Sequence, residues 1–451
     1  MAAEMTVTRE KLAEYLADPN KFDCGIAISN PDVITMHQGT AIGYFCPPPQ
    51  VRLFGDGWKK LFGNTEKTWQ SKPHFTLGIA QFPFHGDRHL DLSSEKRQTV
   101  DNMLYVPDCA ENDYLSLKVN MFRPPKQDPE SFLSKPIKIA IEPSNRIRSG
   151  STVAIFNKSE TTKTRYLHLT PGCYRLIPSR ANWSSFVIYL MDANSLGEEE
   201  KDFKTKEGYI NYGSIVQLVD SVTDVALPLM RIMEVINGIV AMDQIGDQNT
   251  PVCQLENCAF QLFDKANSYV SIQHNKIESA YGTDLNDVID EIQDTEIWTI
   301  MSTNEAKYRF YEAMGPVSDL VTPVPTITLM EMKKTAKSDG TPITLVEFTG
   351  SYFRNEHQIW CGLHELRQNV DSTDRITCVL PTYDEVWSHH GMAYCNVKDT
   401  VIFPITITRN DGVVFGTPYY FSYYEVADDG GEPAMVHPLT ECMRPKRLRW
   451  F

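Results

Sequence analysis

Short apolar runs separated by Gly, Pro, Asn and Asp recur along most of the chain. Runs of roughly four to eight residues bounded by turn-forming residues are typical of β-strands. We expect strands over residues 114–122, 136–141, 151–157, 184–191, 214–222, 269–273 and 296–303. Many short strands at such spacing predict an all-β chain built from barrels or sandwiches.

Two segments depart from this strand pattern. Residues 8–16 begin with Thr8 and space their apolar residues as an amphipathic helix does, so we expect a helix there. Residues 285–296 are rich in acidic side chains. Their pattern fits either a helix or an acidic loop insertion, and the sequence leaves both open.

The last part of the chain begins at a proline-rich segment. Residues 321–325 read Val-Thr-Pro-Val-Pro, and Pro-x-Pro segments are extended and stiff, so we expect a linker. The runs beyond it predict a final sandwich of about 100 residues. Within it, Asp411-Gly412 predicts a hairpin turn, because this pair suits positive φ. Residues 427–438 are turn-rich, and we expect them to be loose.

The composition is that of a globular chain, with 42% hydrophobic and 11% aromatic residues. No window approaches the roughly 18 uninterrupted apolar residues of a membrane span, and the charged N-terminal segment is unlike a secretory signal. Ten cysteines without a Cys-x-x-Cys frame favour reduced thiols in the cytosol or nucleus. A formal charge of −15 opposes non-specific attraction to nucleic acid, although a local basic patch can exist within it.

Enzyme and metal motifs are weak in this sequence. Residues 85–91 place two histidines four apart, but Gly86 and the surrounding strand pattern argue against the helix that a metal site would need. Ser388 stands next to a histidine, which does not make a catalytic triad. The acidic run at 197–202 is typical of a solvated loop. We expect no catalytic site, no metal and no cofactor.

Seven longer blocks give a more specific signal. They are "YFCPPPQVRLFGDGWKK" (44–60), "FLSKPIKI" (132–139), "TRYLHL" (164–169), "EGYINYGSIVQLVDSVTDVALP" (207–228), "QLENCAFQL" (254–262), "WTIMSTNEAKYRFYEAMGPVSDLVTPVP" (298–325) and "ITRNDGVVFGTPYYFSY" (407–423). In order and spacing, these blocks resemble the CSL family, the DNA-binding transcription factors of Notch signalling of the Suppressor of Hairless type. The chain looks like a divergent member or paralogue of that family.

The resemblance implies a fold and a domain order. It predicts an N-terminal Rel-like immunoglobulin sandwich (1–146), a central β-trefoil (147–322), a C-terminal Rel-like immunoglobulin sandwich (323–426) and a tail (427–451). Periodicity alone predicts the β class and would not identify a trefoil.

The resemblance also implies a DNA-reading surface, and the chain departs from it. In the family, the Cys-Pro-Pro-Pro segment faces DNA, and an arginine before it reads the major groove, where its donors can bind guanine bidentately. Gly43 stands at that position here and has no side chain to reach a base. The stiff proline frame is kept. By resemblance, the candidate DNA contacts are Tyr44, Phe45, Gln50, Lys59, Lys60, Lys158, Lys163 and Arg165.

Two further DNA elements of the family are altered. The trefoil loop at 156–168 is two residues shorter than the family pattern and carries Glu160 near its tip, where phosphates repel a carboxylate. The segment at 141–150, lysine-rich in the family, is shorter and contains an acidic residue. These changes predict weakened or lost DNA recognition. The alternatives are that basic residues such as Arg146 and Arg148 compensate, and that Arg165 instead holds the trefoil together.

The family's trefoil also holds an apolar pocket for a Trp-bearing peptide of Notch or of a corepressor, which works by desolvating an aromatic anchor. Alignment on the central blocks places Phe203, Thr205, Gln217, Ala226, Leu227 and Ser279 on its lining. Thr205, Gln217 and Ser279 differ from the family residues and make the pocket more polar. The alternative is that Phe203 and Ala226 are ordinary core residues.

These observations predict a nuclear transcriptional regulator that acts through protein contacts, with DNA binding weak or absent. The alternative is an orthodox DNA-binding factor that recruits coactivators or corepressors, and an enzyme is a remote third possibility. Expected partners are a Notch-type or corepressor peptide and other transcription or chromatin proteins, with no membrane, and the chain alone is expected to be monomeric. The basic cluster at 444–450 fits either a nuclear-import or docking tail or a solubilising terminus.

Overall fold

The computed structural model describes most of the chain, and every statement of absence below refers to the described residues. These are residues 6–35, 42–63, 72–82, 86–93, 95–107, 113–140, 145–158, 164–192, 205–241, 250–284, 289–336, 340, 342–382, 385–386, 396–397, 400–424, 436–438 and 446–447. Strands dominate and helices are few, so the all-β fold class is confirmed.

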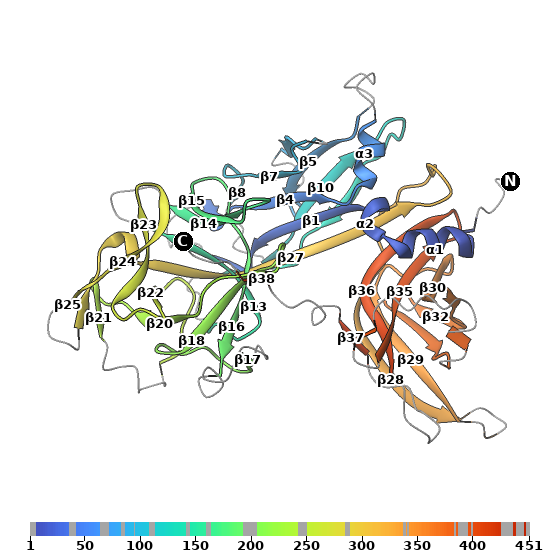
Figure 1. Ribbon diagram of the computed structural model, residues 1–451. Helices are drawn as coiled ribbons and strands as arrows, with labels where there is room; N and C mark the ends of the chain where they lie inside the picture. Colours follow the sequence, from blue (N-terminus) through green and yellow to red (C-terminus); the bar gives the residue numbers. More distant parts are fainter. Residues whose placement is uncertain are drawn as a thin grey trace.

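One long strand, β27 (Trp298–Glu312), joins all three regions of the molecule (Figure 1). It pairs with β22 (Asn257–Leu262) and β13 (Ser151–Asn157) of the central region. It then pairs along residues 303–310 with β1 (Cys24–Pro31) of the N-terminal region. Its last two residues pair with β36 (Val413–Tyr424) of the C-terminal region. The three regions therefore share one continuous backbone ladder.

The N-terminal region packs two main sheets around Trp58. One sheet contains β1, β4 (Gln50–Phe54) and β7 (Gln98–Val100). The other has the order β11 (Glu130–Leu133), β10 (Leu117–Phe122), β5 (His74–Ile79) and β6 (Arg88–Leu90). Trp58, on α3 (Gly57–Phe62), is fully buried and donates its indole N–H to the carbonyl of Gly25 at 2.9 Å. Smaller pairings join β2 (Val33–Thr35) and β9 (Tyr114–Leu115) to β12 (Ile137–Ala140), and β3 (Ile42–Tyr44) to β8 (Tyr105–Pro107).

The central region is a succession of antiparallel hairpins, as expected for a β-trefoil. Its strands, besides β13 and β22, are β14 (Arg165–Thr170), β15 (Arg175–Ser179), β16 (Phe186–Met191), β17 (Thr205–Lys206), β18 (Ile215–Asp220), β19 (Val225–Ala226), β20 (Met230–Glu234), β21 (Ile239–Ala241), β23 (Ser268–Gln273), β24 (Lys276–Tyr281), β25 (Thr283–Asp284) and β26 (Ile289–Glu291). Alternate apolar residues of these strands meet in one core around Trp298. The indole of Trp298 donates to the carbonyl of Val270 at 2.8 Å, so its polar end is satisfied inside that core.

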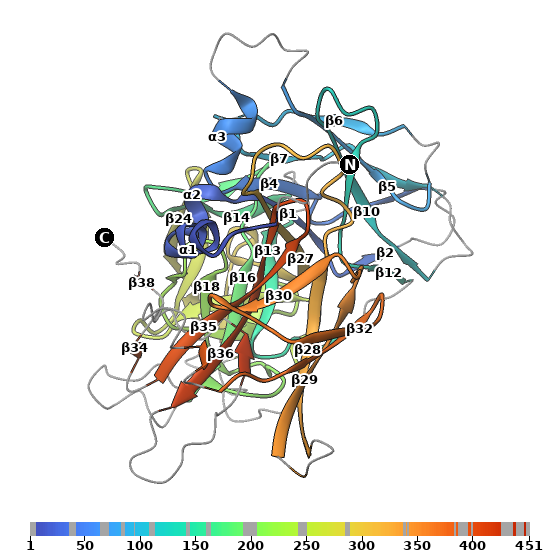
Figure 2. The same cartoon turned by 90° about the vertical axis from the view of Figure 1, so that its right-hand side faces the viewer.

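The C-terminal region is a two-sheet sandwich, below the N-terminal sheets in Figure 2. One sheet has the order β28 (Thr326–Ala336), β29 (Pro342–Ser351), β33 (Arg375–Val379) and β32 (Gln368–Ser372). The other contains β30 (His357–Cys361), β31 (His364–Glu365), β34 (Asn396–Val397), β35 (Thr400–Arg409), β36 and β37 (Val436–Pro438). The predicted hairpin at Arg409–Gly412 is confirmed, with Gly412 at a φ of 93° between β35 and β36.

The predicted N-terminal helix is confirmed as α1 (Arg9–Ala17), which Thr8 caps by accepting from the amide of Lys11 at 3.3 Å. A single turn, α2 (Pro19–Phe22), follows. The apolar face of α1 packs with Trp360 and Val414 of the C-terminal sandwich. The first residues of the chain therefore cover a C-terminal surface, although the predicted domain division places them in the first domain. That division stays a prediction.

Two local expectations need correction, and the expected linker at 321–325 is packed. The acidic segment 285–296 is not an α-helix over its described part: residues 289–291 form β26, residues 292–293 are irregular, and a 3-10 helix (Asp294–Glu296) follows, whose Glu296 is buried. The proline-rich linker is packed: Val321 and Val324 are buried, and the amide of Val321 donates to Glu130 at 3.1 Å. Within the expected loose tail, β37 pairs with residues 419–421 of β36.

None of the described helices is both long enough and apolar enough to span a bilayer.

Candidate functional site

The proline segment is anchored on the trefoil. The indole of Trp183 donates to the carbonyl of Pro48 at 2.9 Å, and Cys46 Sγ lies 3.6 Å from the hydroxyl of Tyr166. Trp183 and Tyr166 are buried in a cluster that Cys46 contacts from the N-terminal region. Prolines lack backbone N–H groups, so their carbonyls are what such a segment can offer to a neighbouring domain. This seam, Cys46–Pro48 against Tyr166 and Trp183, fixes the two regions relative to each other.

Gly43 lies beside this seam in a two-stranded ribbon. It is opposite Val106, and Tyr44 is opposite Tyr105, in the pairing of β3 with β8. The exposed large side chains of β8 and the turn before it are Met103 and Tyr105, at 66% and 41% exposure. Gly43 is itself buried, as is its cross-strand partner Val106, and the exposed side chains on and just before β8 carry no charge.

Asp101 organises the turn that leads into this ribbon. Its carboxylate accepts from the amides of Met103 and Leu104 at 2.8 and 2.9 Å. It also accepts from Arg88 Nε at 2.7 Å. Arg88 is therefore held in an ion pair within the N-terminal region.

Lys158 is the candidate DNA contact that the structure places best. It is exposed just after β13, and its positive charge favours the thiolate of Cys46, although burial of Cys46 is the larger effect and raises the pKa of that thiol. Arg165 is half-buried and donates to Asn275 at 2.6 Å, which supports the interpretation that it holds two trefoil hairpins together. Lys163, with Glu160, lies outside the described residues.

The other DNA candidates are not brought to the seam. Lys59 and Lys60 are exposed on α3, which Figure 1 shows at the end of the N-terminal region away from the trefoil. Lys59 pairs with Asp56 at 2.9 Å. The side chains of Phe45 and Gln50 are 6% and 8% exposed, so they are packing groups in this structure. Of Tyr44 only the backbone is described.

Two exposed arginines that the sequence did not single out lie on or next to the β14–β15 hairpin of the trefoil. Arg175 begins β15, opposite Thr170, and Arg180 follows the end of that strand. Both belong to the hairpin that leads to Trp183. Their position in the sequence could have identified them, because they lie between the "TRYLHL" block and Trp183, in one trefoil hairpin.

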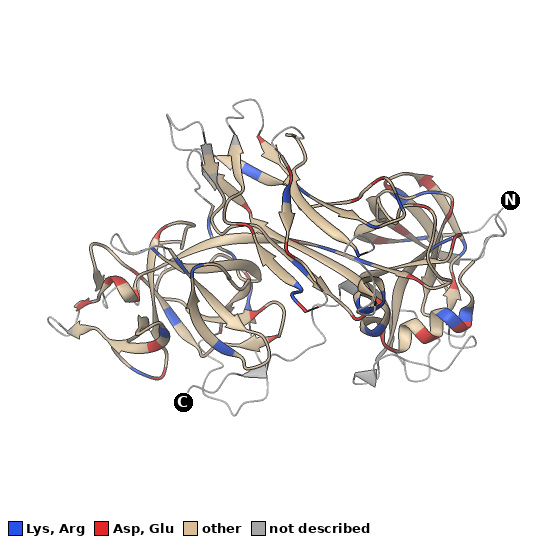
Figure 3. Ribbon diagram, turned by 90° about the horizontal axis from the view of Figure 1, so that it is seen from above, with Lys and Arg blue, Asp and Glu red and all other residues tan. Residues whose placement is uncertain are grey.

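The arginines of the interdomain segment are bound to the trefoil surface. The guanidinium carbons of Arg146 and Arg148 lie 5.8 and 5.1 Å from the ring centre of Tyr209. Their backbones form isolated bridges to Cys253 and Tyr209. Cation–π contact of this kind keeps both charges over one ring and so competes with phosphate for them. Figure 3 shows basic and acidic residues interspersed over all three regions rather than gathered in one stripe.

The predicted peptide pocket is only partly assembled by the described residues. Gln217, Ala226 and Leu227 lie together on the β18–β19 hairpin and are buried. Thr205 is exposed on β17, which pairs with β16 beside β18. Ser279 is exposed on β24, whose partner is β23, on a different hairpin (Figure 1). Phe203 lies outside the described residues.

Gln217 has a structural bond rather than a free amide. Its Nε2 donates to the carbonyl of Leu227 at 2.8 Å, and the amide of Leu227 donates to Leu218 at 2.7 Å. The cavity that Leu227 lines inside the core is about 10 Å³, which is too small for an indole. The core behind this hairpin therefore has no room for an indole.

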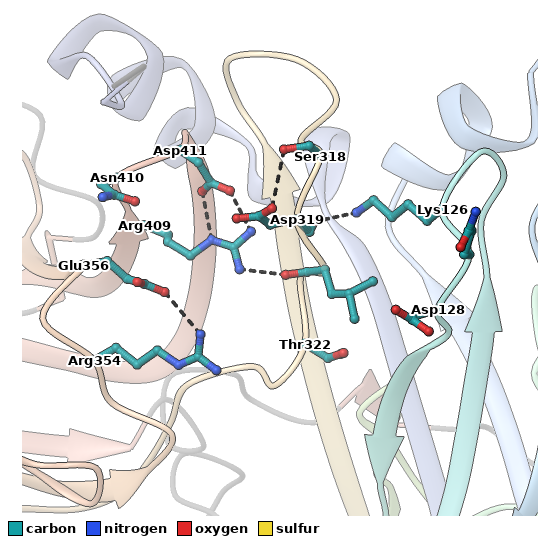
Figure 4. A pocket seen from close by; sticks show the side chains of 12 residues that line it. Lys126, Asp128, Ser318, Asp319, Thr322, Arg354, Glu356, Arg409, Asn410 and Asp411 are labelled. Carbon is teal, nitrogen blue, oxygen red and sulfur yellow. Dashed lines mark hydrogen bonds and ion pairs between the residues drawn. The ribbon is translucent and has the colours of Figure 1, made fainter. Parts of the chain in front are cut away.

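A polar cavity of about 440 Å³ lies where the N-terminal region, the 313–325 connection and the C-terminal sandwich meet (Figure 4). Lys126 donates to the carbonyl of Asp319 at 2.5 Å, and Arg409 donates to Leu320 at 2.7 Å. Arg409 also forms a bidentate ion pair with Asp411. Lys126 and Arg409 are thus already bonded to other residues that line the cavity. The cavity is a feature of the interface between the regions.

Comparison with known families covers the three regions in order. Residues 38–151 match the family described as "LAG1, DNA binding", residues 174–298 match "Beta-trefoil DNA-binding domain", and residues 324–423 match "TIG domain". The chain belongs to the CSL family. Its relatives include the recombining binding protein suppressor of hairless-like proteins of Homo sapiens and Mus musculus. They are 26% and 27% identical, over 92% and 84% of this chain and 83% and 76% of those proteins.

A more distant relative is Transcription factor cbf11 of Schizosaccharomyces pombe, 25% identical over 56% of this chain and 41% of that protein. CSL proteins are DNA-binding transcription factors and not enzymes, so the chain is a CSL-type transcription factor by family. The TIG and trefoil matches agree with the sandwich and hairpin architecture described above.

Proposed function

We propose that this CSL protein regulates transcription in the nucleus chiefly through protein contacts of its trefoil and C-terminal sandwich, and that its sequence-specific DNA recognition is weakened. The observation that carries the proposal is Gly43. It sits in the β3–β8 ribbon beside the seam, opposite Val106, where the family has a base-reading arginine.

The surroundings of Gly43 do not supply a substitute donor from the candidates described. Phe45 and Gln50 are buried, and Arg88 is bound to Asp101. The two lysines of α3 lie at the far end of the region. Removing a bidentate contact to guanine takes away about 1–3 kcal/mol of discrimination, and no other candidate stands where it would recover that amount.

The proline segment that would position a base-contacting side chain is nonetheless retained. The bond from Trp183 to Pro48 and the contact of Cys46 with Tyr166 hold the proline segment on the trefoil. A fold that retains this seam can still place two domains along a duplex. Phosphate contacts position a protein without reading sequence, so weak, non-specific binding fits this arrangement.

Orthodox sequence-specific DNA binding is the second candidate function. It is favoured by the matches to two DNA-binding families and by exposed cations of the trefoil, which are Lys158 near Cys46 and, on or next to the β14–β15 hairpin, Arg175 and Arg180. In that case, basic residues on the trefoil would bind the DNA that Gly43 cannot reach.

The deciding experiment is a fluorescence anisotropy titration of the full chain against two labelled duplexes of equal length and base composition. One carries the DNA site preferred by CSL proteins, and the other is scrambled. We expect similar dissociation constants, in roughly the 10⁻⁴–10⁻⁶ M range of non-specific binding at physiological salt. Discrimination of about 1,000-fold or more, as specific factors show, would establish the orthodox function instead.

The protein-contact half of the proposal has its own test. A Trp-bearing peptide of the Notch or corepressor type should bind the trefoil near Ala226 and Leu227, on the outer side of the β18–β19 hairpin. Isothermal titration calorimetry would measure it. If no heat of binding is seen even with a chain that ends at Thr440, which lacks residues 441–451, the peptide-binding role is wrong.

A further inference from the structure

The C-terminal end of the chain returns to the trefoil. Strand β38 (Lys446–Arg447) runs parallel to β19, with Lys446 opposite Val225 and Arg447 opposite Ala226. The same β19 pairs on its other side with β18, through Ala226 and Val219. Among the described strands, β18 and β38 are the ones that pair with β19. Without β38, this strand would present an open edge.

An open strand edge is a binding surface for extended peptide, because its unpaired N–H and C=O groups give affinity to any chain that adds a strand. This edge is preorganised by the trefoil. The Gln217 amide holds the carbonyl of Leu227, directly after β19. Before β19, Asp220 accepts from the amides of Val222 and Thr223 at 3.1 and 2.8 Å. A rigid edge of this kind loses little conformational entropy when a strand docks.

The composition of the docking segment suits its site. Four of the six residues from Arg444 to Arg449 are basic, in a chain with a formal charge of −15. The turn that enters β19 carries the partly exposed Asp224. Opposite charges on the two partners steer docking and favour one register over others.

The connection to the C-terminal sandwich is short. β37 holds residues 436–438 against β36, and seven residues separate Pro438 from Lys446. A short tether gives the tail an effective concentration near the trefoil on the order of millimolar. An external peptide that uses the same edge therefore has to displace a local competitor.

We propose that the C-terminal segment around Lys446 and Arg447 is an intramolecular ligand of the trefoil, which closes the β19 edge against external extended peptides. The docking itself depends only on the strand pairing. The competition rests on the peptide-binding role proposed above for the same hairpin.

The test uses the full chain and a chain that ends at Thr440. The probe is a fluorescein-labelled peptide of residues 443–451, followed by anisotropy. The truncated chain should bind this peptide at least about tenfold more tightly than the full chain, because its edge is vacant. A scrambled peptide of identical composition controls for charge alone and should bind both chains equally weakly.

A second probe peptide carries Lys446→Pro and Arg447→Pro, which remove the ladder N–H groups without touching the protein. It should bind the truncated chain about tenfold less tightly than the native peptide. In hydrogen exchange, amides of residues 218–228 should exchange faster in the truncated chain than in the full one. Equal affinity of both chains for the native peptide would overturn the proposal, and so would binding of the scrambled peptide to the truncated chain as tight as that of the native peptide.

The two proposals fail separately. If the tail peptide binds the truncated chain but a Notch-type peptide does not, the intramolecular contact stands and the external peptide role falls. If the Notch-type peptide binds full and truncated chains equally and the tail peptide binds neither, the edge is open and the intramolecular ligand is wrong.

Discussion

The indole N–H of Trp183 donates to the carbonyl of Pro48 across 135 residues of sequence, at 2.9 Å and within a buried contact. This bond joins the trefoil to the proline segment of the N-terminal region. Since the prolines offer no N–H of their own, the bond is a main polar link in the seam. It gives a physical role to the three consecutive prolines: they present a fixed carbonyl to a neighbouring domain.

The first prediction concerns this bond. Trp183→Phe keeps an aromatic ring but leaves the buried Pro48 carbonyl without its donor, which should destabilise the protein by about 1–3 kcal/mol in urea unfolding. The matched control is Trp360→Phe, which removes an equivalent bond to Thr408 Oγ1 at 2.9 Å inside the C-terminal sandwich. Limited proteolysis should separate the N-terminal region from the trefoil faster in the first variant than in the control. Equal cleavage in both would show that the seam does not depend on this bond.

The second prediction concerns a buried ion cluster where the N-terminal region meets the end of β27. Glu130 is fully buried and accepts from Arg123 and Lys126, each at 2.8 Å, while Arg123 also binds Glu312 at 2.9 Å. Glu130→Ala removes the buried carboxylate that both cations share and leaves the amide of Val321 without this acceptor. It should therefore lower the free energy of unfolding by about 3–5 kcal/mol.

Glu14 provides the comparison for that variant. It pairs with Lys11 at 2.9 Å, but both side chains are about half exposed. Exposed pairs of this kind contribute little, so Glu14→Ala should leave the unfolding midpoint unchanged within error. Similar destabilisation by the two variants would mean that burial of the Glu130 cluster does not set its energetic importance.

The third prediction is a pH dependence from Asp23. Burial raises the pKa of its carboxyl from 3.8 to about 6, although Arg309 and the hydroxyl of Tyr15 act in the opposite direction. Because the folded state holds this proton more tightly than the unfolded chain, the stabilisation is complete below pH 4 and is lost as the pH rises through about 6. Over that window, the loss should amount to about 3 kcal/mol, since one pKa unit corresponds to roughly 1.4 kcal/mol.

Asp23→Asn isolates that contribution. The amide cannot ionise, so the variant should gain stability relative to the native chain between pH 4 and pH 7. Other titrating groups are common to both proteins and cancel in the difference. A difference that stays flat across this range in denaturant titrations would show that Asp23 does not titrate there.

Local signals in the sequence were sufficient for some elements and not for others. The helix after Thr8 and the hairpin at Asp411-Gly412 follow from a cap and a turn pair a few residues long, so the sequence predicts both. The packing of that helix on Trp360 depends on contacts more than 300 residues apart, which no local pattern encodes. The burial of Glu296 likewise depends on a distant hydroxyl, that of Ser271, and on its own 3-10 turn.

For the candidate site, the resemblance supplied positions but not their surroundings. It placed Gln217 in a pocket, yet the side chain bonds to the backbone of Leu227 because the hairpin turns it inward. It offered Gln50 as a DNA contact, yet strand pairing with Ser29 and Val100 buries that residue. Alignment identifies the equivalent position of a residue in the family. The side of the sheet on which its side chain lies depends on strand register, which alignment does not give.

The fourth prediction returns to Gly43. Gly43→Arg adds a guanidinium at a buried position of the β3–β8 ribbon, next to the seam that the Trp183–Pro48 bond holds in place. If the proline segment is correctly placed and only the base-contacting side chain is missing, this one change should increase the difference in binding free energy between the CSL site and the scrambled duplex by about 1–3 kcal/mol. Gly43→Gln is the matched control, because it adds a long side chain at the same place without charge.

Lys158→Ala should weaken binding to both duplexes alike and reduce the slope of log K against log salt by about one, as expected for a phosphate contact. Anisotropy titrations at several salt concentrations would measure all three. If Gly43→Arg strengthens both duplexes equally, the new charge finds only phosphate, and the proline frame no longer faces the bases.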